Sequence, residues 1–164
     1  MGEENSTLDI ENIATNLLDT DKLKEFLDFY DFLHKNKLGK KKTGRKISSY
    51  SWAITYKSRR IGGFKFHGNS WTIGLFNLFP AANWFEKIGK YLNAELIDFI
   101  LANINSTSSC CVKGVCHSVE NKIILGRLFN NRVCGCETVK LINPDDKALK
   151  YVKELVLIGK EIIA

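Results

Sequence analysis

Between residues 50 and 76 the sequence alternates apolar and polar positions with a period of two. In the first of three such runs the apolar positions are Tyr50, Trp52, Ile54 and Tyr56. Side chains two positions apart point to the same face of a strand, so this pattern predicts a half-buried β-strand. Residues 61–66 and 71–76 are read as two further strands, and turn signals at 57–60 and 67–69 separate the three runs. The segment predicts a three-stranded antiparallel meander.

Apolar residues at helical spacing flank this meander on both sides. They predict helices over 8–18, 21–35, 84–92, 94–104 and from about 144 to 163. The residues expected to cap these helices at their N-termini are Thr20, Asn93 and Asn143. Residues 122–129 and 132–142 are expected to pair as strands around Asn130-Asn131.

Strands and helices come in separate runs, which is typical of α+β proteins. We expect one domain over residues 1–164, because 164 residues suffice for one core and not comfortably for two. Its antiparallel β-sheet, a three-stranded meander plus a further hairpin, is expected to be covered by N-terminal, middle and C-terminal helices. Within it we expect an acidic helical segment (1–36), a basic loop (37–48) and a sheet-and-helix body (49–164).

Charge is segregated along the chain, although the net charge is only +6. Residues 1–31 hold nine acids and two bases, whereas residues 32–84 hold eleven bases and no acid. The basic segment 35–60 is therefore a candidate nucleic-acid contact surface. Its candidate residues are Lys40, Lys41, Lys42, Arg45, Lys46, Arg59 and Arg60. The alternative is a solvated linker whose charges pair with the acidic N-terminal helices.

Aromatic residues are concentrated between residues 50 and 85, where ten occur. They predict an apolar pocket for a small ligand, whose candidate lining residues are Trp52, Tyr56, Phe64, Trp71 and Trp84. Beside basic residues, the same rings could stack on nucleic-acid bases. A third interpretation is that they form the core between the sheet and the helices.

All five cysteines fall within 27 positions, from Cys110 to Cys136. Zinc is held by four Cys or His ligands, and the candidate set is Cys111, Cys116, Cys134 and Cys136. Two alternatives stay open. The cysteines could be reduced thiols in the core, or one could act in thiol or redox chemistry, with His117 as a base.

No motif for nucleotide binding or for nucleophilic or metal-dependent hydrolysis occurs in the chain. Nothing in the sequence argues for an enzyme. We therefore expect a non-enzymatic module that binds a small ligand or a partner. Nucleic-acid binding and cysteine-based redox chemistry are the two alternatives. The chain shows no secretory signal and no long apolar run, and its cysteine count is odd. A reduced cytoplasmic location without membrane contact is the corresponding expectation.

Several short motifs together resemble an uncharacterised family of small bacterial cytoplasmic proteins. They are, in chain order, Leu27-Asp28-Phe29-Tyr30-Asp31-Phe32-Leu33, Trp52-x-Ile54-x-Tyr56-Lys57, Ile124-Leu125-Gly126-x-x-Phe129-x-Asn131-x-x-Cys134 and Asn143-Pro144-Asp145. The resemblance implies no known activity. It implies a set of cysteines ahead of and within the glycine-phenylalanine strand, which maps onto Cys111, Cys116 and Cys134. Cys110 and Cys136 are additional to that pattern.

Overall fold

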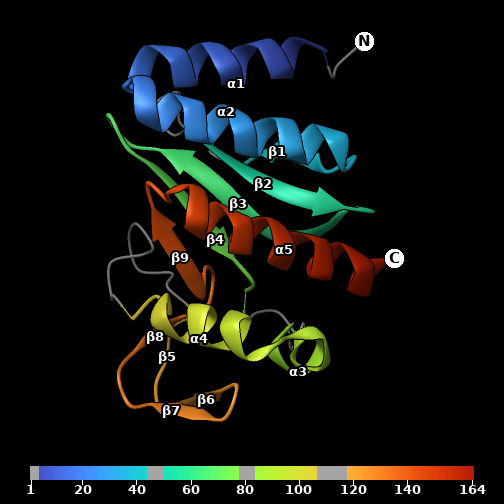
Figure 1. Ribbon diagram of the computed structural model, residues 1–164, viewed down its shortest axis with the longest axis vertical. Helices are drawn as coiled ribbons and strands as arrows, with labels where there is room; N and C mark the ends of the chain where they lie inside the picture. Colours follow the sequence, from blue (N-terminus) through green and yellow to red (C-terminus); the bar gives the residue numbers. More distant parts are fainter. Residues whose placement is uncertain (1–3, 44–49, 78–83, 107–117) are drawn as a thin grey trace.

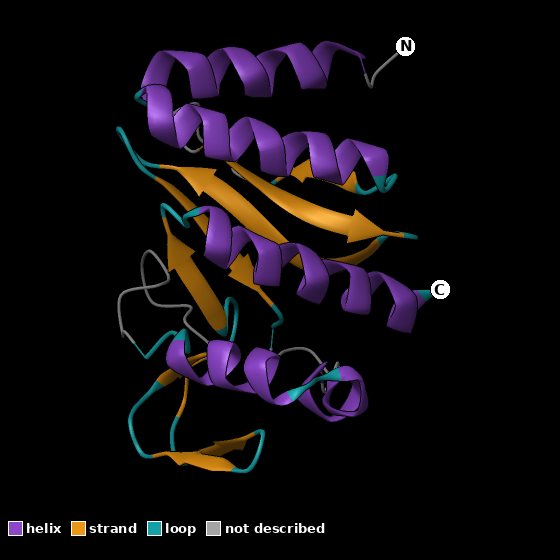
Figure 2. Ribbon diagram, viewed as in Figure 1, coloured by secondary structure: helices purple, strands orange, loops and turns teal. Residues whose placement is uncertain are grey.

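The computed structural model describes residues 4–43, 50–77, 84–106 and 118–164 (Figures 1 and 2). The order of its elements is α1 (Glu4–Leu17), α2 (Thr20–Lys35), β1 (Gly39–Lys42), β2 (Tyr50–Tyr56), β3 (Arg59–Phe66), β4 (Trp71–Leu75), α3 (Trp84–Ile88), the 3-10 helix η1 (Gly89–Tyr91), α4 (Ala94–Ala102), β5 (Ser118–Val119), β6 (Lys122–Ile124), β7 (Arg127–Phe129), β8 (Val133–Cys134), β9 (Val139–Ile142) and α5 (Asp146–Ile163).

The main sheet has five antiparallel strands in the order β1-β2-β3-β4-β9. The expected meander is its centre, formed by β2, β3 and β4. Lys57 and Ser58, at φ 45° and 63°, make the two-residue turn between β2 and β3. The α+β class and the N-terminal, middle and C-terminal helices are confirmed.

The expected basic loop is wrong for residues 39–42. They form β1, an edge strand that pairs antiparallel with β2, with Lys42 opposite Trp52 and Gly39 opposite Thr55. Strand β1 pairs with backbone groups at the edge of β2, and the exposed side chains of Lys41 and Lys42 keep their ammonium groups in water. Residues 44–48 of the expected loop lie outside the described residues.

The expected hairpin around Asn130-Asn131 is also corrected. Strands β6 and β7 turn at Leu125 and Gly126, at φ 48° and 82°. Gly126 adopts this left-handed conformation without steric cost. Residues 139–142 leave the hairpin and form β9, which pairs with β4 and completes the main sheet.

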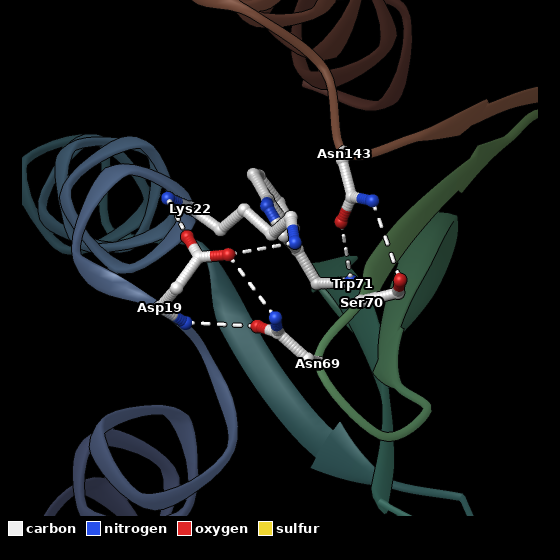
Figure 3. A network of polar contacts seen from close by, with 6 residues as sticks. All are labelled: Asp19, Lys22, Asn69, Ser70, Trp71 and Asn143. Carbon is white, nitrogen blue, oxygen red and sulfur yellow. Dashed lines mark hydrogen bonds and ion pairs between the residues drawn. The ribbon is translucent and has the colours of Figure 1, made fainter.

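Two of the three expected N-caps are wrong. Asn93 caps α4 as expected, by accepting from the Leu96 backbone N–H at 2.9 Å. However, Asp19 caps α2 and Asp145 caps α5. Asn143 instead lies at φ 45°, and its Oδ1 accepts from the Trp71 backbone N–H at 2.9 Å. It joins the end of β9 to the start of β4 (Figure 3).

A polar cluster joins the corner between α1 and α2 to the turn between β3 and β4 (Figure 3). The Asp19 carboxylate accepts from the Lys22 backbone N–H at 3.1 Å and pairs with Lys22 Nζ at 2.8 Å. Asn69 Nδ2 donates to the same carboxylate at 3.1 Å, and Asn69 Oδ1 accepts from the Asp19 backbone N–H at 2.8 Å. The bonds from Lys22, and then that from Asn69, lower the pKa of Asp19 from 3.8 to about 2.

Helices α2 and α5 cover one face of the sheet (Figure 1). Phe26 of α2 is 0 % exposed, and its ring centroid lies 4.8 Å from that of Phe66 and 5.2 Å from that of Trp71. Gly159 of α5 lies against Ile61 of β3, because a side chain there would meet Ile61 at 2.8 Å. The core lies between these helices and the sheet.

We predict that Phe26→Ala lowers the free energy of unfolding by about 3–5 kcal/mol, because it leaves a cavity among four aromatic rings. Urea unfolding followed by circular dichroism measures this loss. Leu128→Ala is the matched control, because Leu128 is 54 % exposed and its loss should cost less than about 0.5 kcal/mol. Equal losses in the two variants would contradict the packing described above.

We also predict a pH-dependent effect of Asp19→Asn. Because folding lowers the pKa of Asp19, its charge stabilises the fold fully above pH 3.8, and this contribution is lost as the pH falls towards about 2. Asparagine keeps the helix cap through its Oδ1, but it replaces the oxygen that accepts from Lys22 Nζ and Asn69 Nδ2 with an NH2 group. The stability gap between wild type and Asp19→Asn should narrow over this window, because the wild-type carboxylate loses its charge there. Asp21→Asn is the control, and a gap for Asp19→Asn that stays constant would refute the assignment.

Candidate functional site

Four of the five candidate pocket residues lie in the packed core. Trp52 and Phe64 are 3 % and 2 % exposed, and their rings stack at 5.5 Å. Trp71 is fully buried beneath α2. Trp84 Nε1 donates to Asn77 Oδ1 at 3.0 Å. These contacts are those of core side chains, as the third interpretation of the aromatic residues expects.

Tyr56, the fifth candidate, lies apart from the other four at the end of β2. Two cations lie over its ring, Lys160 Nζ at 5.1 Å and Lys57 Nζ at 5.7 Å from the centroid. Lys160 Nζ also donates to the Asn36 carbonyl at 2.8 Å. Tyr56 thus helps to hold α5 against the sheet and the end of α2.

Two shallow cavities lie elsewhere, near the C-terminal end of α4. One, of about 410 Å³, lies between α4 and the β6–β7 hairpin, and the other, of about 240 Å³, lies beside β9. None of the five candidate pocket residues lines either cavity. The predicted aromatic ligand pocket has no counterpart in these two cavities.

The cysteine site is described only in part. Cys110, Cys111 and Cys116 lie outside the described residues, as does His117. Cys134 ends β8 and is 1 % exposed, whereas Cys136 follows the strand and is half-buried. Within the described ranges no three potential ligands come close enough to hold a metal ion. The four-cysteine zinc site stays a prediction.

The second face of the sheet carries small and basic side chains. In Figure 1, α2 and α5 lie in front of the sheet, α1 lies above α2, and α3 and α4 lie beyond the lower end of the sheet. One row crosses all five strands on this face, because the register successively pairs Lys41, Ala53, Gly63, Gly74 and Lys140. Lysines therefore stand at both edges of the sheet, and the three positions between them carry a methyl group or no side chain.

Two further cations lie on the same face, both from β3. Arg60 pairs with Thr55 and Lys65 with Ser51, and these partners lie two positions on either side of Ala53. Residues two apart on a strand share a face, so Arg60 and Lys65 flank the central row. We call the surface formed by Lys41, Arg60, Lys65 and Lys140 the cationic sheet face.

Two paired glycines, Gly63 of β3 and Gly74 of β4, occupy the centre of the cationic sheet face. A Cβ at Gly63 would lie 3.1 Å from the Arg60 guanidinium, and a Cβ at Gly74 would lie 2.6 Å from Glu137 Cγ. The side chains of Arg60 and Glu137 therefore lie flat against the sheet where the glycines leave room. Glu137 Oε2 lies 3.5 Å from Lys65 Nζ.

The described acids of the N-terminal helices do not neutralise the basic strands. Within the described ranges, Asp19 pairs with Lys22, Asp31 with Lys35, and Asp28 with Lys153 of α5. The candidates that form no ion pair with any described residue are Lys41, Lys42, Arg59 and Arg60. The expected pairing with the acidic helices is not found for these four residues among the acids whose side chains are described, a set that leaves out Glu3, Glu4 and Asp9.

Lys40 differs from its neighbours because it folds back against α2. Its Nζ lies 3.1 Å from His34 Nε2 and 4.9 Å from the centroid of the Tyr30 ring. Burial, and then the charge of Lys40, lower the pKa of His34. Arg45 and Lys46, the remaining nucleic-acid candidates, lie outside the described residues.

Sequence reasoning did not single out Lys140 and Glu137. Lys140 stands between Val139 and Leu141, so its alternation with apolar neighbours indicated the outer face of a strand. No local signal places Glu137, because its position over Gly74 depends on how β9 joins the sheet.

No protein-family model matches the chain, and comparisons with curated proteins and with solved structures give no match. The resemblance to an uncharacterised bacterial family therefore stays a prediction. Among the described residues, no helix is long and apolar enough to cross a membrane.

We predict that Cys136 reacts with an alkylating reagent in the folded, reduced protein, whereas Cys134 reacts only on unfolding. Cys134 is buried, so the reagent does not reach its thiol in the folded protein. Mass spectrometry of fragment ions separates the two positions. Fast reaction of both thiols in the folded protein would contradict the described burial. Protection of Cys136 that a chelator removes would instead support the predicted zinc site.

Proposed function

We propose that the protein is a non-enzymatic binding module that holds nucleic acid through phosphate contacts on the cationic sheet face. One observation carries the proposal. Four basic side chains share one face of the sheet, and within the described part of the chain the one ion pair that any of them forms is that of Lys65 with Glu137. Exposed cations with few internal partners attract polyanions.

The size of the face suits an extended strand of phosphates. Lys41 and Lys140 are four strands apart, which corresponds to about 19 Å at about 4.8 Å per strand. Arg60 and Lys65 pair with residues four positions apart, which corresponds to about 13 Å along the sheet. A distance of about 19 Å spans about six phosphates of one duplex strand. Between its lysines the central row itself is buried, and the side chains of Arg60 and Glu137 cover its glycines, so we expect phosphates to contact the charged ends of the basic side chains and not the sheet backbone.

The chemistry of the face favours phosphate contacts over base stacking. The rings of Trp52 and Phe64 belong to the face covered by helices, whereas Arg60 and Lys65 belong to the opposite face. The stacking mode considered for the sequence therefore has no support in the arrangement of these residues. Binding through phosphates is independent of base sequence and weakens steeply with salt.

The test is fluorescence anisotropy with labelled oligonucleotides of mixed sequence, longer than the face, in single-stranded and duplex form. Salt is varied between about 50 and 200 mM. We predict that log K falls linearly with log salt, with a slope near −3 on duplex DNA for three to four phosphate contacts. The double variant Lys41→Ala/Lys140→Ala should make this slope shallower by about 2.

A matched control separates a local surface from the overall charge. Lys147→Ala/Lys150→Ala removes the same charge from exposed positions on α5, which covers the other face. This control should keep the wild-type slope. Wild-type protein that binds neither oligonucleotide at low salt would refute the proposal. A control that loses as much slope as the double variant would do the same.

A further inference from the structure

Glu137 occupies part of the cationic sheet face. The Cβ, Cγ and Cδ atoms of its side chain would lie 2.8, 2.6 and 2.7 Å from a Cβ at Gly74. No positive φ is found at Gly74, so the glycine there provides space and not an unusual backbone conformation. The side chain of Glu137 fills that space, and it is only 17 % exposed.

The backbone around Glu137 is fixed by its neighbours. The Glu137 carbonyl accepts from Asn105 Nδ2 at 3.2 Å, and the next residue, Thr138, donates its N–H to the Phe76 carbonyl at 3.0 Å. Thr138 Oγ1 donates to the Cys134 carbonyl at 3.1 Å. These three hydrogen bonds hold the backbone of Glu137 beside the sheet, and none of them involves Lys65. Only the side-chain torsions of Glu137 have to change for the carboxylate to leave.

The carboxylate engages a cation that the proposed function requires. Lys65 is 33 % exposed, and its Nζ lies 3.5 Å from Glu137 Oε2. A phosphate that approaches Lys65 meets a negative charge already at that position. If both anions stayed on the same ammonium group, they would lie close enough to repel each other. Binding at Lys65 therefore requires the carboxylate to move away or to be neutralised.

We infer that Glu137 is a built-in competitor that lies over Gly74, holds Lys65 and weakens nucleic-acid binding until a phosphate displaces it. This inference rests on the proposed function and adds regulation of the same face. Such a competitor lets an extended array of phosphates bind, because contacts at Lys41, Arg60 and Lys140 offset the displacement. It excludes small anions, which reach only one cation at a time.

The test compares Glu137→Gln with wild type in the same anisotropy experiment. Glutamine keeps the shape of the side chain and removes its charge. It should tighten oligonucleotide binding about two- to fivefold at low salt. The slope of log K against log salt should become steeper by about 0.9, the value of one added phosphate contact. Urea unfolding confirms that the variant is folded.

Two further variants show whether the gain passes through Lys65. Glu154→Gln makes the same change of charge at an exposed position on α5, and it should leave binding unchanged. In a Lys65→Ala background, Glu137→Gln should give a clearly smaller gain than in wild type, because the two residues are coupled. An equal gain in both backgrounds, or an equal gain from Glu154→Gln, would overturn the competitor role.

The outcomes also separate this inference from the proposed function. Wild-type protein that binds oligonucleotides through Lys41 and Lys140, with Glu137→Gln unchanged from it, leaves the proposed function standing and refutes the competitor. Protein that does not bind in either form refutes both. Wild-type binding that becomes tighter in Glu137→Gln, with the gain reduced in the Lys65→Ala background, supports both.

Discussion

The packing of α2 on the sheet decides what the other face of the sheet can present. The Phe26 ring meets Phe64, Phe66 and Trp71, which come from two neighbouring strands. Since side chains alternate along a strand, burying these rings under α2 sends the intervening residues to the opposite face. Those residues include Lys65 and the glycines at 63 and 74. The aromatic core and the cationic sheet face are thus two consequences of one register.

The same alternation explains which parts of the structure were predictable. The meander and the helices follow from local periodicity, and so do the identities of the core rings. The position of β9 was not predictable, because Val139–Ile142 reads as a strand without indicating its partner. Its pairing with β4 depends on contacts between residues about 70 positions apart. The edge strand β1 was missed because Gly39-Lys40-Lys41-Lys42 has the composition of a loop and gains strand structure only from pairing with β2.

The candidate site was predictable only in its chemistry. With a solvated linker as the alternative, the absence of acids between residues 32 and 84 made this segment a candidate anion-binding surface. Its shape required the fold, because Lys140 joins the surface from a strand far along the chain and Glu137 from the loop before it. The sequence allowed the aromatic residues to form the core and the basic residues to form a surface. In the fold these two groups belong to opposite faces of one sheet. Of the five cysteines, only Cys134 and Cys136 fall within the described residues, so the predicted zinc site is described only in part.

The composition of the cationic sheet face is unfavourable for stability alone. Gly63 and Gly74 pair directly across β3 and β4, and glycine weakens a strand because it has no side chain to pack and loses more entropy on folding. Basic residues surround these glycines, and their mutual repulsion opposes folding. A larger residue at Gly63 would not relieve the first cost, because a Cβ there would lie 2.8 Å from the Trp52 carbonyl oxygen. Glu137 relieves the repulsion only at Lys65 and needs the space above Gly74 to do so. Packing therefore accounts for the glycines, whereas it does not account for the positive charge that remains at Lys41, Arg60 and Lys140.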